Sequence, residues 1–309
     1  MKNVLLYWNH ICILHKQEKA HLERLAQRLL TEGISLDIRY FGMGYPMHLS
    51  EYLAKEEAIL PDILVSADLE VFEDPRIFQR FSSSLLPAAQ WLTLRKSEAL
   101  KAIWRNEALL PILSIPLVYY TREPEYCQNQ LLSEIPGLAI GGINNSVIKT
   151  AVKALWERRG KTAAVSFLEN CQTADMPIGA YGMVRQKKAT TALVPSLYAL
   201  RANGQDSFLE IPSEGPMLLP SFLAARNTLS QEVAQIVANG ILSPELCEFY
   251  AKNGDLIMHI EGFSGHSRQE ASCYFTPSAS WLSTLDPREF DDLYRKKLPQ
   301  AKLNFNYPL

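Results

Sequence analysis

Polar side chains follow three apolar segments of the sequence, at the points where strands would end. Amide, hydroxyl, imidazole and carboxylate groups of this kind can hold an anion or a metal ion. Ligands of open α/β sheets bind at the carboxyl ends of strands, so we expect ligand-binding turns at these places. The candidates are Asn9 and His10 after strand 3–8, Ser66 and Asp68 at the end of strand 62–65, and Asn144, Asn145 and Ser146 after strand 138–142.

Each of these turns also has a purely structural interpretation. Asn and Ser side chains at a helix start accept hydrogen bonds from the first N–H groups of the helix, and this could be the whole role of residues 144–146. The same helix start offers N–H groups and the positive end of the helix dipole to an anion. Ser66 and Asp68 can bond the backbone of their own turn. Residue types alone leave both interpretations open.

Two tyrosines and one glutamate form a second group of candidates. Phenolate oxygens suit ferric ions and aromatic rings line binding clefts, so Tyr119 and Tyr181 are candidate ligand residues, with core packing as the alternative. Side chains alternate along a strand, so only one of Tyr119 and Tyr120 points inward. Glu214 precedes Gly215 on a predicted turn, where glycine would allow a ligand to approach closely.

Metal chelation and catalysis find little support in the motifs. His10, Cys12 and His15 fit no standard zinc spacing, so we favour cleft lining for His10, and the metal ligands stay unknown. The segment 159–162 ends like a phosphate-binding loop, but Leu155 stands where that motif begins with glycine. No nucleophile–base constellation is evident. The sequence predicts a binding protein rather than an enzyme, without a cofactor other than a metal ion or oxyanion bound as the ligand.

Length and composition set the class of protein. A chain of 309 residues is long for one domain and suits two. The net charge of −2 with dispersed charges argues against nucleic acid as a partner. No apolar run approaches the ~20 residues of a membrane helix. The first residues lead directly into a strand without a secretory leader, which predicts a cytoplasmic protein, or a periplasmic or extracellular one if a leader is missing from this numbering.

Apolar periodicity predicts an alternating start to the fold. The apolar stripe Leu22, Leu25 and Leu29 has helical spacing, and Gly33 would end that helix as a C-cap. A strand–helix–strand order favours parallel pairing with a right-handed crossover. The expected elements are strand 3–8, helix 15–30, strand 35–41, helix 50–59 and strand 62–65.

Two extended segments predict a chain that crosses between two lobes. Segment 111–120 is longer than a usual strand and contains two prolines, and segment 207–213 would be the return crossing. We therefore predict an α/β protein of two lobes, each a mixed sheet flanked by helices. Lobe one would contain residues 1–112 and 213–309, and lobe two residues 113–212.

Several segments resemble, in the same order, the type II periplasmic solute-binding proteins of ABC transporters, and the ferric-iron type most of all. The resemblance covers roughly residues 3–255. It implies a two-lobed fold with a ligand cleft between the lobes. The adjacent tyrosine pair of iron-binding members is absent, since Tyr181 and Tyr198 stand apart. The segments are Pro61–Ser66, Ile115–Tyr120, Thr191–Pro195, Ile211–Gly215 and Leu242–Glu245.

The resemblance implies a solute-binding component of a transport system that closes on a small ligand by hinge rotation. A metal ion such as ferric iron, or an oxyanion, is the expected ligand, and an ABC permease is the expected protein partner. An enzyme or a cytoplasmic ligand sensor on the same two-lobe scaffold is the alternative.

Overall fold

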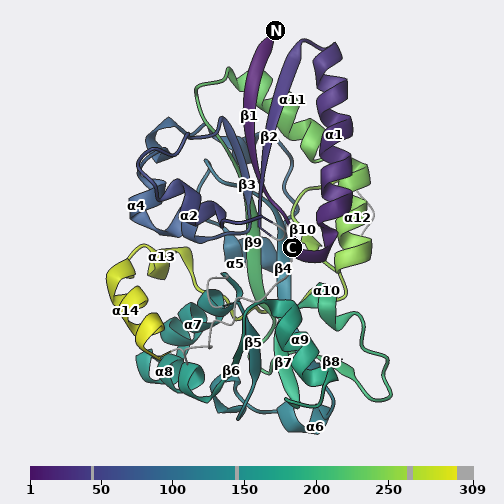
Figure 1. Ribbon diagram of the computed structural model, residues 1–309, viewed down its shortest axis with the longest axis vertical. Helices are drawn as coiled ribbons and strands as arrows, with labels where there is room; N and C mark the ends of the chain where they lie inside the picture. The colour runs from purple at the N-terminus through teal and green to yellow at the C-terminus, as the bar shows by residue number, and fades with distance from the viewer. Residues whose placement is uncertain (43–44, 143–145, 263–266, 298–309) are drawn as a thin grey trace. The chain divides into compact units, whose positions relative to one another are not determined.

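The computed structural model describes residues 1–42, 45–142, 146–262 and 267–297 (Figure 1). The chain forms two compact units, each made of two separate stretches. The first unit contains Met1–Ile115 and Leu218–Ser272, and the second contains Pro116–Met217 and Cys273–Leu309.

The first unit is built on a mixed sheet with strand order β2-β1-β3-β9-β4. β1 pairs in parallel with both β2 and β3, as the strand–helix–strand pattern predicted, whereas β9 runs antiparallel to β3. A short strand, β10, pairs antiparallel with β4. The strands are β1 (Lys2–Asn9), β2 (Ile34–Phe41), β3 (Ile63–Ser66), β4 (Leu110–Thr121), β9 (Met217–Ala225) and β10 (Ile257–Met258).

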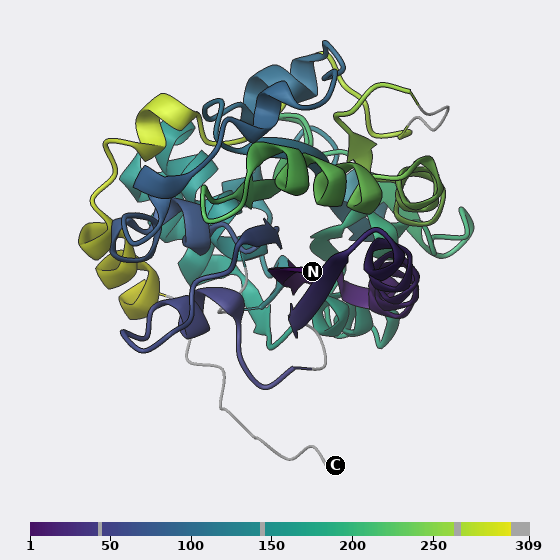
Figure 2. The ribbon, with the colours of Figure 1, turned by 90° about the horizontal axis from the view of Figure 1, so that it is seen from above.

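Helices α1, α11 and α12 pack beside one another in this unit (Figures 1 and 2). α1 buries Leu22, Leu25 and Leu29 as expected. Ser230 and Ser243 cap α11 and α12 by accepting N–H bonds. The helices of the unit are α1 (His15–Thr31), α2 (Leu49–Leu53), α3 (Glu70–Glu73), α4 (Pro75–Phe78), α5 (Glu98–Ile103), α11 (Gln231–Ile241) and α12 (Pro244–Gly254), with 3-10 turns at Cys12–Leu14, Ser82–Ser84 and Ala88–Gln90.

In the second unit the strand order is β4-β7-β5-β6. β7, β5 and β6 are parallel, while β4 runs antiparallel to β7 and also pairs with β8. The elements are β5 (Ala139–Gly141), β6 (Gln172–Ala174), β7 (Thr191–Pro195), β8 (Phe208–Glu210), α6 (Pro124–Cys127), α7 (Ser146–Arg159), α8 (Lys161–Asn170), α9 (Pro177–Arg185), α10 (Ser196–Ala199), α13 (Ala279–Leu282) and α14 (Pro287–Lys297), with a 3-10 turn at Leu132–Glu134.

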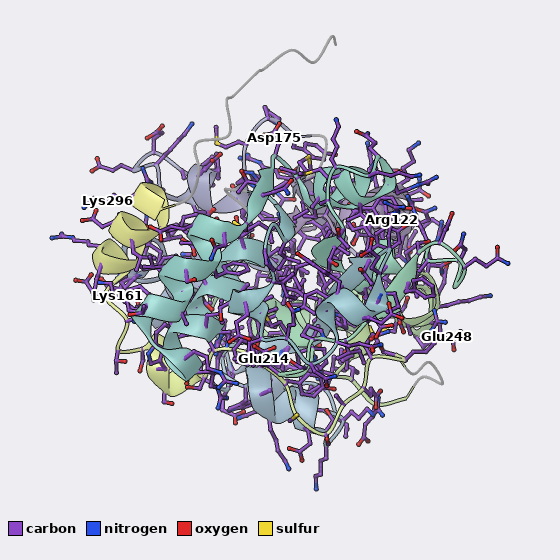
Figure 3. The ribbon with its side chains drawn as sticks, turned by 90° about the horizontal axis from the view of Figure 1, so that it is seen from below. Arg122, Lys161, Asp175, Glu214, Glu248 and Lys296 are labelled. Carbon is purple, nitrogen blue, oxygen red and sulfur yellow. The ribbon has the colours of Figure 1, made fainter. Side chains whose placement is uncertain are left out.

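The C-terminal segment packs on the second unit, whereas the sequence analysis placed it in lobe one. Glu157 of α7 accepts the backbone N–H of Ser278 at 2.7 Å and so holds the start of α13. Lys161 at the start of α8 donates to Glu289 of α14 at 2.6 Å, and Figure 3 shows Lys161 beside that helix. Phe290 is buried under Lys153 of α7, whose ammonium lies 4.8 Å from the ring centre.

The return strand also differs from the prediction. Only Phe208–Glu210 is a strand within the expected segment 207–213, and the long returning strand is β9. Every residue of β9 is buried, including Pro220, which cannot donate a backbone hydrogen bond and argues against a central strand in a sequence. Because of this proline, the sequence pattern of residues 217–225 did not predict a strand.

Candidate functional site

The carboxyl ends of the parallel strands meet at one edge of the first unit's sheet. Asn9 is the last residue of β1 and lies opposite Phe41 of β2. The His10 N–H donates to the carbonyl of Phe41 at 2.9 Å, which extends this pairing by one residue. β3 pairs with the other side of β1 and ends at Ser66. The structure thus brings two predicted pairs, Asn9 with His10 and Ser66 with Asp68, to neighbouring strand ends.

Gly42 allows the chain to turn closely around this edge. Its φ of +95° is a conformation that side chains with a Cβ rarely adopt. A Cβ there would lie 3.2 Å from both the Asn9 side-chain nitrogen and the His10 carbonyl oxygen. A glycine is therefore required where the loop after β2 passes the end of β1.

His10 makes the most specific contact at this edge. Its Nδ1 lies 2.7 Å from Oε2 of Glu18, and the two side chains are 1% and 0% exposed. A carboxylate accepts hydrogen bonds and does not donate them, so Nδ1 carries the hydrogen of this bond. The other ring nitrogen, Nε2, is buried and has no hydrogen-bond partner among the residues that the structure describes.

Glu18 is held by two further donors. The backbone N–H of Ile11 lies 3.1 Å from Oε2, and the hydroxyl of Tyr250 on α12 donates to Oε1 at 2.7 Å. Burial, and then the Glu18 carboxylate, raises the pKa of Tyr250 well above its ordinary value, so this hydroxyl keeps its proton. A buried carboxylate is tolerable when donors saturate it, and here they come from two segments, residues 10–11 and α12.

Two aromatic rings stack on the imidazole of His10. The Tyr40 ring stacks on the imidazole, with centroids 4.9 Å apart and planes 7° apart. The Tyr45 ring lies 5.7 Å from the imidazole at 23°. Both tyrosines are partly exposed, so His10 lies one side chain below the surface.

Ser66 and Asp68 serve the local backbone in this structure. Ser66 Oγ accepts the N–H of Asp68 at 2.8 Å, and Asp68 Oδ2 accepts the N–H of Ser50 at the start of α2 at 2.9 Å. Burial raises the pKa of Asp68. Ser66 thus bonds the backbone of its own turn, whereas the Asp68 carboxylate bonds the start of α2, and a ligand contact of either residue stays a prediction.

Tyr119 lies in the core of the second unit. It is fully buried on β4, and its hydroxyl has no hydrogen-bond partner in the described part of the chain. Burial, and then the charge of Glu214, raises its pKa well above 10. Glu214 itself accepts the backbone N–H of Leu132 at 2.9 Å. Its carboxylate therefore links the turn at residue 214 to the 3-10 turn Leu132–Glu134 of the same unit.

Tyr181 is part of a cluster of tyrosines and arginines. Its ring lies 4.6 Å from the ring of Tyr120 and 6.1 Å from that of Tyr198. The guanidinium groups of Arg185 and Arg201 lie 6.0 and 5.8 Å from the same ring. Tyr120 is opposite Ala192, near the amino end of β7, whereas Tyr198 lies in α10, directly after the carboxyl end of that strand.

Of the predicted residues 144–146, Ser146 is the one that the structure describes. It is the first residue of α7 and is buried. Asn144 and Asn145 lie outside the described residues, so their part in the predicted anion site stays a prediction.

Within the described ranges, no three His, Cys, Asp or Glu side chains gather as a metal site would require. No helix described is long and apolar enough to cross a membrane.

Sequence reasoning missed Glu18 and Tyr250. Glu18 lies four residues before Leu22 and so on the apolar stripe of α1, where a charged residue is anomalous. That position was the available signal, because a buried carboxylate needs a partner. Nothing in the sequence paired it with Tyr250, which lies on a helix far along the chain.

Comparisons with known proteins bear on the fold. No protein-family model matches the chain, and no curated protein matches its sequence. Among solved structures, iron-bound HitA from Pseudomonas aeruginosa matches with a TM-score of 0.68 at 15% identity, over 96% of this chain and 99% of that one. A periplasmic thiamin-binding protein matches with a TM-score of 0.63 at 12% identity, over 97% and 98%. AfuA from Actinobacillus pleuropneumoniae, a periplasmic binding protein with bound fructose-6-phosphate, matches with a TM-score of 0.61 at 12% identity, over 97% and 100%.

The chain has the fold of the type II periplasmic solute-binding proteins, and the predicted fold class is confirmed. The matched structures are binding proteins rather than enzymes. The expectation of a cytoplasmic protein is contradicted by the neighbours, two of which are periplasmic proteins.

Proposed function

We propose that this protein is the solute-binding component of an ABC transport system, which binds a small ligand and releases it unchanged. The observation that carries the proposal is the match of nearly the whole chain to solute-binding proteins. The polar strand ends of the first unit, with the buried and unpartnered Nε2 of His10, add a candidate contact for the ligand.

The ligand class is a proposal of its own. A metal ion such as ferric iron, or an oxyanion, is the class that the sequence predicted. The neighbours bind iron, thiamin and a sugar phosphate, so the fold accommodates ligands of either charge. That the ligand lies between the two lobes stays a prediction, as does the permease partner in the membrane.

A binding panel tests the function. We would measure the melting temperature of the purified protein with ferric citrate, inorganic phosphate, thiamin and fructose 6-phosphate, and confirm each hit by calorimetry. A ligand at 100 times its Kd stabilises the folded state by about 2.7 kcal/mol. His10→Gln and Ser146→Ala should weaken the binding of each hit. The control is Ser280→Ala, at an exposed position of α13.

Mass spectrometry of the recovered ligand distinguishes binding from catalysis. An unchanged ligand supports a transport role, whereas a product would support the enzyme alternative. A panel without any stabilising compound, repeated on protein unfolded and refolded to remove bound material, would contradict the proposed function.

A further inference from the structure

The contacts around His10 indicate more than a place in the core. One ring nitrogen is fixed by a buried carboxylate, and the other is buried without a partner among the described residues. Leaving a buried polar atom without a partner destabilises the folded protein. Such a cost calls for an explanation, and a bound ligand is one that the position of His10, at the end of β1, provides.

We propose that Glu18 and Tyr250 are positioning residues of the ligand site, which hold the His10 ring so that Nε2 meets the solute. This inference rests on the proposed function and assigns residues that the sequence did not single out. Glu18 fixes Nδ1 as a donor and thereby leaves Nε2 as the ring atom available to the ligand.

Tyr250 extends the arrangement to a second helix. Its hydroxyl donates to Oε1 of Glu18, while Oε2 receives the bonds from His10 and Ile11. Each carboxylate oxygen is thus committed, so Glu18 cannot rotate without losing a bond. The rotamer of His10 is therefore set jointly by α1 and α12, which belong to the same unit.

The neighbouring rings keep this arrangement close to solvent. Tyr40 and Tyr45 contact the imidazole and are partly exposed. A ligand therefore reaches Nε2 past one layer of side chains and not through the core.

The test follows the two ring nitrogens directly. We would label the six histidines with 15N, assign His10 by comparison with His10→Gln, and record long-range 1H–15N spectra. The probes are inorganic phosphate and gallium(III) citrate, a diamagnetic stand-in for the ferric ion. The variants are Glu18→Gln and Tyr250→Phe, with Glu23→Gln as the control, because Glu23 is an exposed residue of the same helix.

The expected result has three parts. Nδ1 of His10 is protonated in the free protein, and at least one probe moves the Nε2 resonance. Glu18→Gln weakens the affinity for that probe roughly 10- to 100-fold, as loss of a residue that orients a ligand contact does. Tyr250→Phe weakens it about 2- to 10-fold, and Glu23→Gln leaves it unchanged.

A merely structural role gives a different pattern. Glu18→Gln would then lower the free energy of unfolding while the folded fraction bound the probe as wild type does. If Glu18→Gln fails to fold, the milder Tyr250→Phe decides. Probe binding that does not move Nε2 overturns this inference alone, whereas a panel in which nothing binds overturns the proposed function with it.

Discussion

Ser114 Oγ and His259 Nε2 lie 2.8 Å apart in the core of the first unit. Neither residue is exposed, and Nδ1 of His259 has no partner in the described chain. Burial, and secondly the charge of Arg95, lowers the pKa of His259 to about 3 from an ordinary 6.5. The pair ties His259, just after β10, to β4, and burial favours the neutral imidazole.

This pair predicts a loss of stability in acid. Between pH 6.5 and 3 the unfolded chain binds a proton at His259 that the folded chain does not, so stability falls as the pH falls through this window. Between pH 7 and 4.5 the contribution is about 2–3 kcal/mol. Urea unfolding at both pH values measures it, and His259→Gln should remove this part of the pH dependence. Equal slopes for the variant and wild type would refute the assignment.

Asp68 predicts the opposite dependence. Its pKa is raised by burial, so its cost is absent in strong acid, grows as the pH rises from the ordinary pKa of the unfolded chain to the raised pKa of the folded chain, and is constant above that. Asp68→Asn retains an acceptor for the Ser50 N–H and should stabilise the protein at pH 7 by about 1 kcal/mol, an advantage that vanishes near pH 3.

The control for Asp68 is Asp74→Asn. Asp74 caps α4 and accepts bonds from the Arg76 side chain at 2.9 and 3.0 Å, so its replacement should destabilise at pH 7. Thermal unfolding compares the two variants. If Asp68→Asn instead costs stability at pH 7, the charged form is favoured by a contact outside those described.

Tyr119→Phe should leave stability within about 1 kcal/mol of wild type or raise it, because the lost hydroxyl has no described partner. Tyr250→Phe is the matched contrast. It removes one of the donors to the buried Glu18 carboxylate and should cost about 1–3 kcal/mol. Urea unfolding measures both. A large loss in Tyr119→Phe would reveal a partner such as an ordered water.

Two glycines of the second unit predict opposite effects of alanine. At Gly141, a Cβ would collide with the backbone of Met176 and Pro177, so Gly141→Ala should cost about 1–3 kcal/mol. At Gly182 within α9, a Cβ meets nothing within 4 Å, so Gly182→Ala should stabilise by about 0.5–1 kcal/mol. Differential scanning calorimetry of the pair checks the close approach of β5 to the start of α9.

The regular elements of the fold were predictable because burial leaves a period in the sequence. The stripe Leu22, Leu25 and Leu29 marked α1, and its flanking apolar runs marked β1 and β2. The pattern predicted a wrong boundary where contacts between residues far apart in the sequence determine the end of a helix. The helix expected at 50–59 ends at Leu53, since Arg80 of a distant segment bonds the carbonyls of Lys55 and Glu56 in place of the next helical turn.

The sequence indicated where the candidate residues lie in the sheet, but not which side chains form hydrogen bonds with one another. Strand ends pointed to His10 and Ser66, because such ends gather at one edge of a parallel sheet. The bond from Tyr250 to Glu18 joins residues 232 positions apart, and no local pattern encodes such a pairing. For Ser66 and Asp68 the sequence allowed two interpretations, because the same residue types occur in structural turns and in ligand sites.

The two units are interleaved along the chain, and this has a consequence for biosynthesis. Unit one lacks β9, α11 and α12 until the chain has been made beyond residue 254, and unit two lacks α13 and α14 until nearly the last residues. Domains usually fold as units while the ribosome extends the chain. Here unit one cannot close before α12 has been made, and unit two cannot close before α14 has been made.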